Sequence, residues 1–280
     1  MSSSVSSYSA EPLGRSPRRV LAAMFGNLAR SPYVAYRLAL KDIKGERTKS
    51  RFATLWDFLD PLILAIVFYV LQAVRVINPG DIHVPYAVFV TFGLLLYQTF
   101  SESVTLPMDV TRRSRNMIAH LKLAPEALIL STLFRILFNS SFRIAAMLLI
   151  AVVLGSFSPL GFVKFLLLFP TIILAGMAFG LVLAPFHTIY NDVGRVTKIV
   201  LIPLRYASPV LYAIPDVAPF VYLKIFNPVA SIITNLRAVA TEDVFIEPGG
   251  FALRVAVLAA VFFFGWFLFH LAAPVVAERA

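Results

Sequence analysis

The chain has 280 residues, of which 59% are hydrophobic and 14% are charged, and its mean hydropathy is +0.81. Soluble domains are about 45–50% apolar and about 25% charged, so this composition excludes a soluble enzyme and a disordered or collagen-like chain. The formal net charge of +10 would suggest nucleic-acid binding in a soluble protein, but in this chain the positions of the charges are more informative than their sum. Because cysteine is absent, disulfides, thiolate nucleophiles and cysteine-based metal sites are also excluded.

The first 54 residues are predicted to lie on the cytoplasmic side of a membrane. Residues 1–30 are polar and basic, lack the apolar stretch of a signal peptide, and are expected to be flexible. Residues 31–54 are predicted to form an amphipathic interface helix, with Leu38, Leu40 and Ile43 on its apolar side. A basic helix of this kind lies in the headgroup plane. The alternative is a solvated basic linker that is attracted to anionic lipid.

The rest of the chain, residues 55–280, is predicted to be an all-α polytopic membrane domain. A transmembrane helix needs about 20 largely apolar residues, and six runs meet this requirement. They are Leu55–Ala73, Val84–Phe100, Leu137–Phe157, Phe162–Phe186, Val196–Ile214 and Phe251–Ala273.

The lysines and arginines indicate how these spans are oriented. If both termini are cytoplasmic, 17 of the 25 basic residues lie on the cytoplasmic side and 4 lie on the external side. The other four, Arg135, Arg143, Arg205 and Arg254, lie in or beside apolar runs. This asymmetry follows the positive-inside rule and predicts a multi-pass protein of the inner (cytoplasmic) membrane.

Two connections between the predicted spans have distinctive patterns. Residues 101–126 contain the basic cluster Arg112–Arg115 and are predicted to form a short helix that is ended by Pro125. From charge alone, this helix is either a docking site for a cytoplasmic partner or only a loop that fixes orientation. Residues 215–250 form an apolar external connection, which predicts two short re-entrant helices that act as a gate.

The sequence shows no catalytic or nucleotide-binding motif. It lacks G-x-x-x-x-G-K-[ST], so this chain is not expected to bind ATP phosphates or another cofactor. The four histidines are scattered, and no pair of carboxylates lies in the middle of a predicted span. These observations argue against a metal site and against proton-coupled transport. Uphill transport would therefore need another subunit that binds ATP and Mg²⁺.

Arginines inside apolar runs need an explanation, because a mid-bilayer arginine costs at least ~2.5–3.5 kcal/mol on insertion scales. Arg205 lies about 15 Å into the fifth run at 1.5 Å per residue, and Arg143 lies in the third run. Each either lines a path for a polyanionic or pyrophosphate-bearing substrate, or is accommodated by snorkelling or an internal ion pair. Tyrosines such as Tyr206 and Tyr212 fit either an aromatic belt or a path for sugars.

Several motifs resemble, in order and spacing, the membrane subunit of ABC-2 type exporters. The resemblance is to the polysaccharide-export branch, which handles capsule, lipopolysaccharide O-antigen and teichoic acid, and it runs from about Leu38 to the C-terminus. The motifs are Leu40-Lys41-Asp42-Ile43-Lys44, Leu55-Trp56-Asp57-Phe58-Leu59-Asp60-Pro61, Asn116-Met117-Ile118 with Pro125-Glu126, Asn191-Asp192-Val193-Gly194-Arg195, Ser208-Pro209-Val210-Leu211-Tyr212 and Asn227-Pro228 with Arg237. The family usually has arginine where this chain has Asn191.

The resemblance implies a permease that exports a lipid-linked polysaccharide through a channel between two copies of the chain. Two copies of a cytoplasmic ABC ATPase would power it, and a periplasmic co-polymerase or outer-membrane conduit is allowed as a further partner. Together with the intramembrane charges, it assigns three sets of residues. They are Arg112, Arg113, Arg115, Asn116, Met117 and Ile118 for ATPase coupling, Arg205, Tyr206, Tyr212 and Arg143 for the substrate path, and Pro209, Asn227, Pro228 and Arg237 for the external gate.

Two other functions stay open at this point. An ABC-2 exporter of a drug or small lipid would use the same scaffold. A membrane-embedded glycosyltransferase or acyltransferase would need a constellation of carboxylates and histidines, and the sequence shows none. No nucleic-acid partner is predicted.

Overall fold

A computed structural model describes residues 17–49, 53–76, 80, 82–114, 123–214, 217, 218, 220, 222 and 226–278. These residues form helices and no strand. The helices are α1 (Pro17–Arg30), α2 (Pro32–Lys49), α3 (Ala53–Ala73), α4 (Tyr86–Arg113), α6 (Pro125–Val153), α7 (Pro159–Leu168), α8 (Pro170–Ile189), α9 (Asn191–Tyr206), α11 (Pro228–Glu242) and α12 (Pro248–Glu278).

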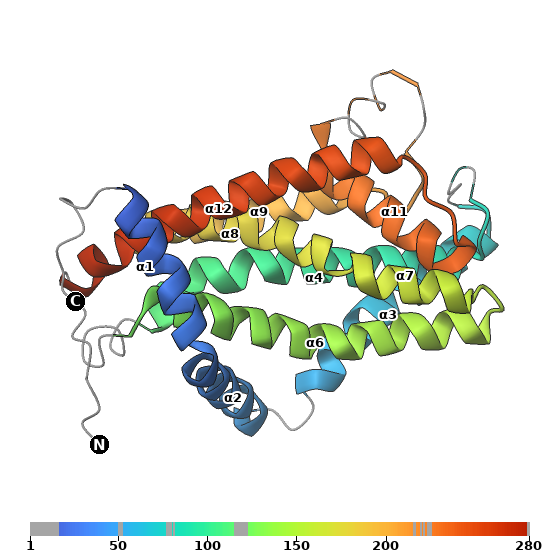
Figure 1. The fold of residues 1–280 in the computed structure, drawn as a ribbon. Helices are drawn as coiled ribbons and strands as arrows, with labels where there is room; N and C mark the ends of the chain where they lie inside the picture. The colour runs from blue at the N-terminus through green and yellow to red at the C-terminus, as the bar shows by residue number, and fades with distance from the viewer. Residues whose placement is uncertain are drawn as a thin grey trace.

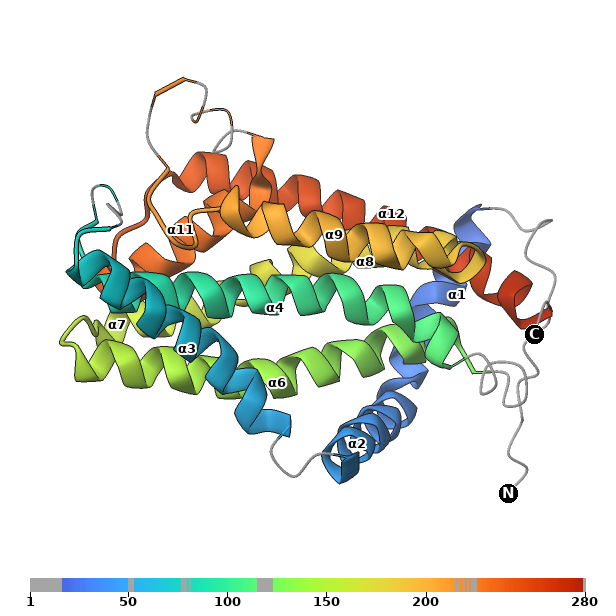
Figure 2. The ribbon, with the colours of Figure 1, turned by 180° about the vertical axis from the view of Figure 1, so that it is seen from behind.

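The long helices run side by side along one axis of the molecule (Figure 1). Helix α4 lies at the centre of the bundle and packs against α8 and α6, and α12 packs against α8. Helices α3 and α9 lie along the face seen from behind (Figure 2). Helix α1 and the C-terminal part of α12 share one end of the bundle, whereas α7 and α11 lie at the other. We call these the α1 end and the α11 end.

Within the part of the chain that the structure describes, four segments are long and apolar enough to cross a membrane: α4, α6, α7 together with α8, and α12. The chain is therefore a multi-pass membrane protein. Helix α3 contains the first predicted span, whereas α9 ends at Tyr206 and contains only residues 196–206 of the fifth, which was predicted to run to Ile214. Helix α9 has only 16 residues, four of them charged, and at 1.5 Å per residue it is about 24 Å long, less than the ~30 Å of the hydrocarbon core. That α3 and α9 cross the membrane stays a prediction.

Helices α4 and α6 are longer than the predicted spans and extend toward the α1 end. Residues 101–113, expected to lie in a separate short helix, continue α4 without a break. The Thr99 and Ser103 hydroxyls donate hydrogen bonds to carbonyl oxygens four residues earlier, at 2.9 and 2.7 Å, so these polar side chains do not interrupt the helix. Pro125, expected to end a helix, begins α6 instead, because proline loses no hydrogen bond in a first turn.

Residues 17–30, expected to be flexible, form helix α1. Val20 and Met24 are buried, and the ring of Phe25 meets Trp266 of α12 edge-on, with centroids 5.3 Å apart. Contact with α12 therefore holds this helix in place, although its sequence is too polar to stand out as an apolar run. Helix α2 forms within the range predicted for the interface helix and packs against α6.

Two glycines of α8 allow close contact with α4. A Cβ atom built at Gly180 would lie 2.5 Å from the carbonyl oxygen of Val104, and one at Gly176 would lie 2.4 Å from the Cβ of Ser103. Small residues let membrane helices approach until their backbones touch. This contact fixes the relative positions of the α4 and α8 ends that carry the site described next.

Candidate functional site

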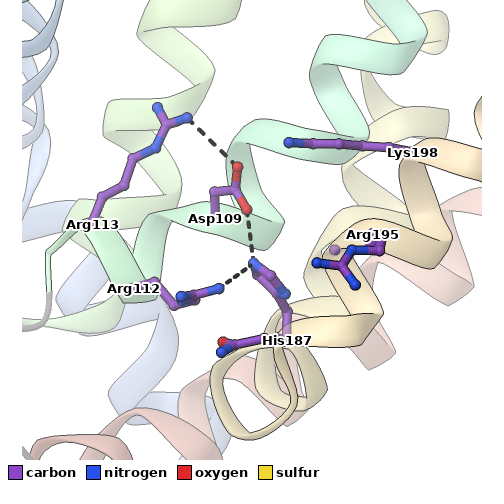
Figure 3. Close-up of a pocket in the computed structure, with 8 residues that line it drawn as sticks. Asp109, Arg112, Arg113, His187, Arg195 and Lys198 are labelled. Carbon is purple, nitrogen blue, oxygen red and sulfur yellow. Dashed lines mark hydrogen bonds and ion pairs between the residues drawn. The ribbon is translucent and has the colours of Figure 1, made fainter.

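A polar pocket opens at the α1 end, between the last turns of α4 and α8 and the first turns of α9. Its volume is about 570 Å³. The lining residues are Asp109, Arg112, Arg113, His187, Asn191, Gly194, Arg195 and Lys198 (Figure 3). Four of these eight residues are arginine or lysine and one is acidic, so the pocket has a net positive charge.

Asp109 lies between two partners in this pocket (Figure 3). Its carboxylate lies 2.9 Å from Nε2 of His187 and 3.5 Å from Nη2 of Arg113. Nη1 of Arg112 lies 3.4 Å from the same His187 nitrogen. When Nε2 donates its proton to Asp109, it cannot also accept one from Arg112. The Arg112 guanidinium then keeps its donors for another acceptor.

Gly194 allows His187 to lie between α8 and α9. A Cβ atom at position 194 would come within 2.4 Å of Cε1 in the His187 ring, so any other residue there would displace the ring. The ring is buried, and among the described residues its Nδ1 has no hydrogen-bond partner. The sequence showed His187 only as one of four scattered histidines, because nothing in the spacing reveals that α8 and α9 bring it beside Asp109.

Two of the predicted ATPase-coupling residues line this pocket. Arg112 and Arg113 form the last turn of α4, and both are exposed. The other four, Arg115, Asn116, Met117 and Ile118, lie outside the described residues. Their coupling role stays a prediction, and the structure adds that the end of α4 meets α9 at this point.

Three of the predicted substrate-path residues lie close together at the end of α9. The Arg205 guanidinium lies 6.0 Å from the ring centroid of Tyr97 in α4. Tyr206 is exposed, and the hydroxyl of Tyr212 donates a hydrogen bond to the Tyr206 carbonyl oxygen at 2.6 Å. The turn after α9 thus folds Tyr212 back against Tyr206 at the end of this helix.

The fourth predicted path residue, Arg143, is buried between α4 and α6. Its Nη1 lies 2.6 Å from Oε2 of Glu102 and 3.4 Å from the Thr99 hydroxyl. Asn139 donates a further hydrogen bond to the other Glu102 oxygen. Arg143 therefore has the internal ion pair that the sequence left open as the alternative to a place on the substrate path.

The predicted gate residues form one hydrogen-bonded unit at the α11 end. The Asn227 side chain caps α11, because its Oδ1 accepts hydrogen bonds from the backbone of Val229 and Ala230 at 3.0 and 3.3 Å. Its Nδ2 donates to the hydroxyl of Ser208 at 2.9 Å. Pro228 occupies the first position of the helix, where its missing N–H costs nothing.

Arg237 connects this unit to α4. Its Nη1 donates to the carbonyl oxygens of Pro209 at 2.9 Å and Phe89 at 3.4 Å, and the guanidinium lies over the Phe89 ring. Burial lowers the pKa of Arg237 to about 9, and the negative charge of Glu242 opposes this shift. The side chain therefore stays a cation at neutral pH, held by carbonyl dipoles and an aromatic face.

Sequence reasoning missed a buried polar cluster at the α1 end. Glu126 of α6 is fully buried, and its Oε1 lies 2.6 Å from Nδ1 of His270 in α12. Asn27 of α1 donates to the other Glu126 oxygen at 3.1 Å. The position of Glu126 in the first turn of a helix was a usable signal, because a carboxylate is favourable at a helix N-terminus. Its partners could not be inferred, since they come from opposite ends of the chain.

A family model described as ABC-2 type transporter matches residues 36–240 of the 280. The chain belongs to the ABC-2 type transporter family. None of the curated proteins compared with it matches. This ABC-2 transporter chain is a membrane component of a transport system, and the family typically works with a cytoplasmic ATPase. The matched range contains the pocket, the Arg205 cluster and the unit around Arg237.

Proposed function

We propose that this ABC-2 transporter chain is the permease subunit of an ATP-driven exporter that moves a lipid-linked polysaccharide across the inner membrane. The hydrogen-bonded unit at the α11 end is the observation that supports this proposal most strongly. Its parts, Ser208–Tyr212 and Asn227-Pro228 with Arg237, are the stretches by which the sequence resembles the polysaccharide branch. Hydrogen bonds join them to each other and to α4, which supports a common role at one end of the transport path.

The α1 end is the cytoplasmic end in this proposal. The basic residues Arg112, Arg113, Arg195 and Lys198 gather there, which the positive-inside rule favours. The α11 end then faces outward, and α11 forms part of the external gate. Both termini are cytoplasmic in this orientation.

A separate cytoplasmic ATPase docks against the segment that begins with Arg112 and Arg113. It binds the ATP and Mg²⁺, and two copies serve two copies of the permease. The position of these arginines supports docking. The end of α4 and the start of α9 line the same pocket, so an ATPase that moves the end of α4 would also move α9.

A second copy of the chain completes the channel. Helix α3 exposes an apolar face with Ile63, Ile66 and Val67, and this face is the one we assign to the partner copy. Arg205, Tyr206 and Tyr212 then lie near the polymer path. A periplasmic co-polymerase or an outer-membrane conduit is a further partner in such a system.

The test is co-purification of the chain with the ATPase encoded nearest to it. We expect a stable complex whose ATP hydrolysis depends on the permease. The triple change of Arg112, Arg113 and Arg115 to Glu should prevent this complex from forming. The matched control changes Arg18, Arg19 and Arg30 of α1 to Glu, which reverses three exposed charges elsewhere. Failure of any ATPase to associate with the parent chain would refute the exporter.

Deletion of the gene identifies the cargo. Loss of a surface polysaccharide, with accumulation of its lipid-linked precursor inside the cell, is the expected result. Unchanged surface polysaccharide together with new sensitivity to a drug would instead identify a drug or small-lipid exporter.

A further inference from the structure

We propose that the pocket between α4, α8 and α9 binds the diphosphate headgroup of the lipid-linked substrate before transport. This inference rests on the proposed function for the identity of the lipid, whereas the anion site itself rests on the geometry alone. The argument has three steps: the charge of the pocket, its position, and its continuity with Arg205.

The charge of the pocket exceeds what its own acid can balance. Asp109 is engaged by His187 and Arg113. Among the described residues, neither Arg195 nor Lys198 has an acidic partner, and Arg112 keeps its donors as described above. Three cations from two helices therefore converge on one cavity, beside the N-terminus of α9, where Asp192 in the first turn offsets part of the helix dipole. A diphosphate diester, with two ionised phosphates, matches this excess better than a phospholipid with one.

The pocket lies where a lipid headgroup can reach it. Arg195 and Lys198 occupy one face of α9, and the exposed aliphatic residues Val196, Ile199 and Val200 lie on the adjoining face. A helix with cations on one face and aliphatic residues on the next is suited to the boundary between headgroups and hydrocarbon. A lipid can therefore place its chain along the aliphatic face and its headgroup in the cavity. The volume of about 570 Å³ is within the ~300–1,000 Å³ common for ligand pockets.

Arg205 continues the cationic face of α9. It follows Lys198 by seven residues, or two helical turns, and so lies on the same side of the helix. At 1.5 Å per residue the separation along the axis is about 10 Å. A phosphate leaving the pocket along α9 would meet Arg205 next, which connects the site to the path assigned above.

The experiment uses the purified permease–ATPase complex in detergent, with farnesyl diphosphate as the probe and binding measured by native mass spectrometry and thermal shift. The variant Arg195→Gln/Lys198→Gln should weaken binding about tenfold for each charge removed, since bonds to charged groups contribute at least one decade in affinity. Arg195→Lys/Lys198→Arg, which keeps both charges, should retain most of the binding. The matched control is Arg19→Gln/Arg30→Gln, which removes two exposed charges from α1.

Parallel titrations distinguish the possible sources of the phosphate. Inorganic pyrophosphate should bind more weakly than farnesyl diphosphate but at the same residues, and phosphatidylglycerol should compete poorly. Equal binding of phosphatidylglycerol and farnesyl diphosphate would overturn the assignment to substrate and identify a phospholipid site. Equal binding of the probe by the parent chain and the Gln variant would overturn the assignment of the anion site to this pocket. Loss of the ATPase from the Gln variant would show that these cations face the partner protein instead.

Failure of the pocket and failure of the proposed function give different results. If deletion of the gene abolishes surface polysaccharide while the Gln variant binds and exports normally, the function stands and the pocket inference fails. If binding depends on Arg195 and Lys198 while deletion leaves surface polysaccharide unchanged, the anion site stands and the proposal that the chain exports a polysaccharide fails.

Discussion

At the scale of single residues, buried charges in this chain are held by partners on other helices. Arg143 pairs with Glu102, Glu126 with His270, and Arg237 with two carbonyl oxygens and an aromatic ring. The sequence marked Arg143 as a charge inside an apolar run and Arg237 as part of a family motif, but it could not show their partners. Glu126 was recognised only as part of the Pro125-Glu126 motif, because nothing in the sequence shows that this acid is buried against His270.

Arg237→Lys is expected to destabilise the chain by about 1–3 kcal/mol, the cost of leaving buried acceptors unsatisfied. A lysine keeps the charge but loses the planar contact with Phe89 and the reach to both carbonyl oxygens. The measurement is the thermal unfolding midpoint in detergent. Arg254→Lys, a similar change at a partly exposed arginine of the same end, should shift the midpoint much less. Equal shifts in the two variants would contradict the role assigned to Arg237.

A double-mutant cycle on Glu126→Ala and His270→Ala should give a coupling energy of about 0.5–3 kcal/mol, as for contacting residues in one network. The exposed pair Lys164–Asp243, with 2.8 Å between Nζ and Oδ1, is the matched control and should give about 0.2–1 kcal/mol. Both energies come from denaturant titration of the purified protein. A coupling near zero for the buried pair would show that the contact contributes nothing to stability.

At the scale of helices, the apolar runs located the four described segments that are long and apolar enough to cross a membrane, but the predicted ends were wrong where polar residues are buried. Hydropathy counts Thr99, Ser103 and Glu102 as the end of a span, whereas the structure satisfies them within α4 or against α6. The pocket could not be predicted for a related reason. Arg195 and Lys198 look like ordinary cytoplasmic charges until α4, α8 and α9 are packed together.

Gly180→Ala is expected to cost about 1–3 kcal/mol, because the added methyl group must push α8 away from the α4 backbone. Gly26→Ala in α1, where a Cβ meets nothing within 4 Å, is the matched control. It should leave stability unchanged or raise it by up to about 1 kcal/mol through helix propensity. Unfolding midpoints of the two variants decide the question, and a loss of stability at both positions would argue against specific packing at Gly180.

At the scale of the whole molecule, the absence of cysteine makes the proposed orientation directly testable. A membrane-impermeant maleimide should label Val244→Cys, in the exposed turn after α11, in spheroplasts with an intact inner membrane. It should label Arg37→Cys, on exposed α2, only after that membrane is permeabilised. The reverse pattern would place the α1 end outside and would invert the roles given to the pocket and to Arg237.

The cluster of Asn27, Glu126 and His270 also imposes an order on biosynthesis. Its first and last members are 243 positions apart, so the complete cluster cannot form until the last helix has been made. At a translation rate of about 5–20 residues per second, this interval is roughly 12–50 s. Helix α1, the first described segment to leave the ribosome, can therefore bond to Glu126 of α6 long before α12 supplies His270 and Trp266.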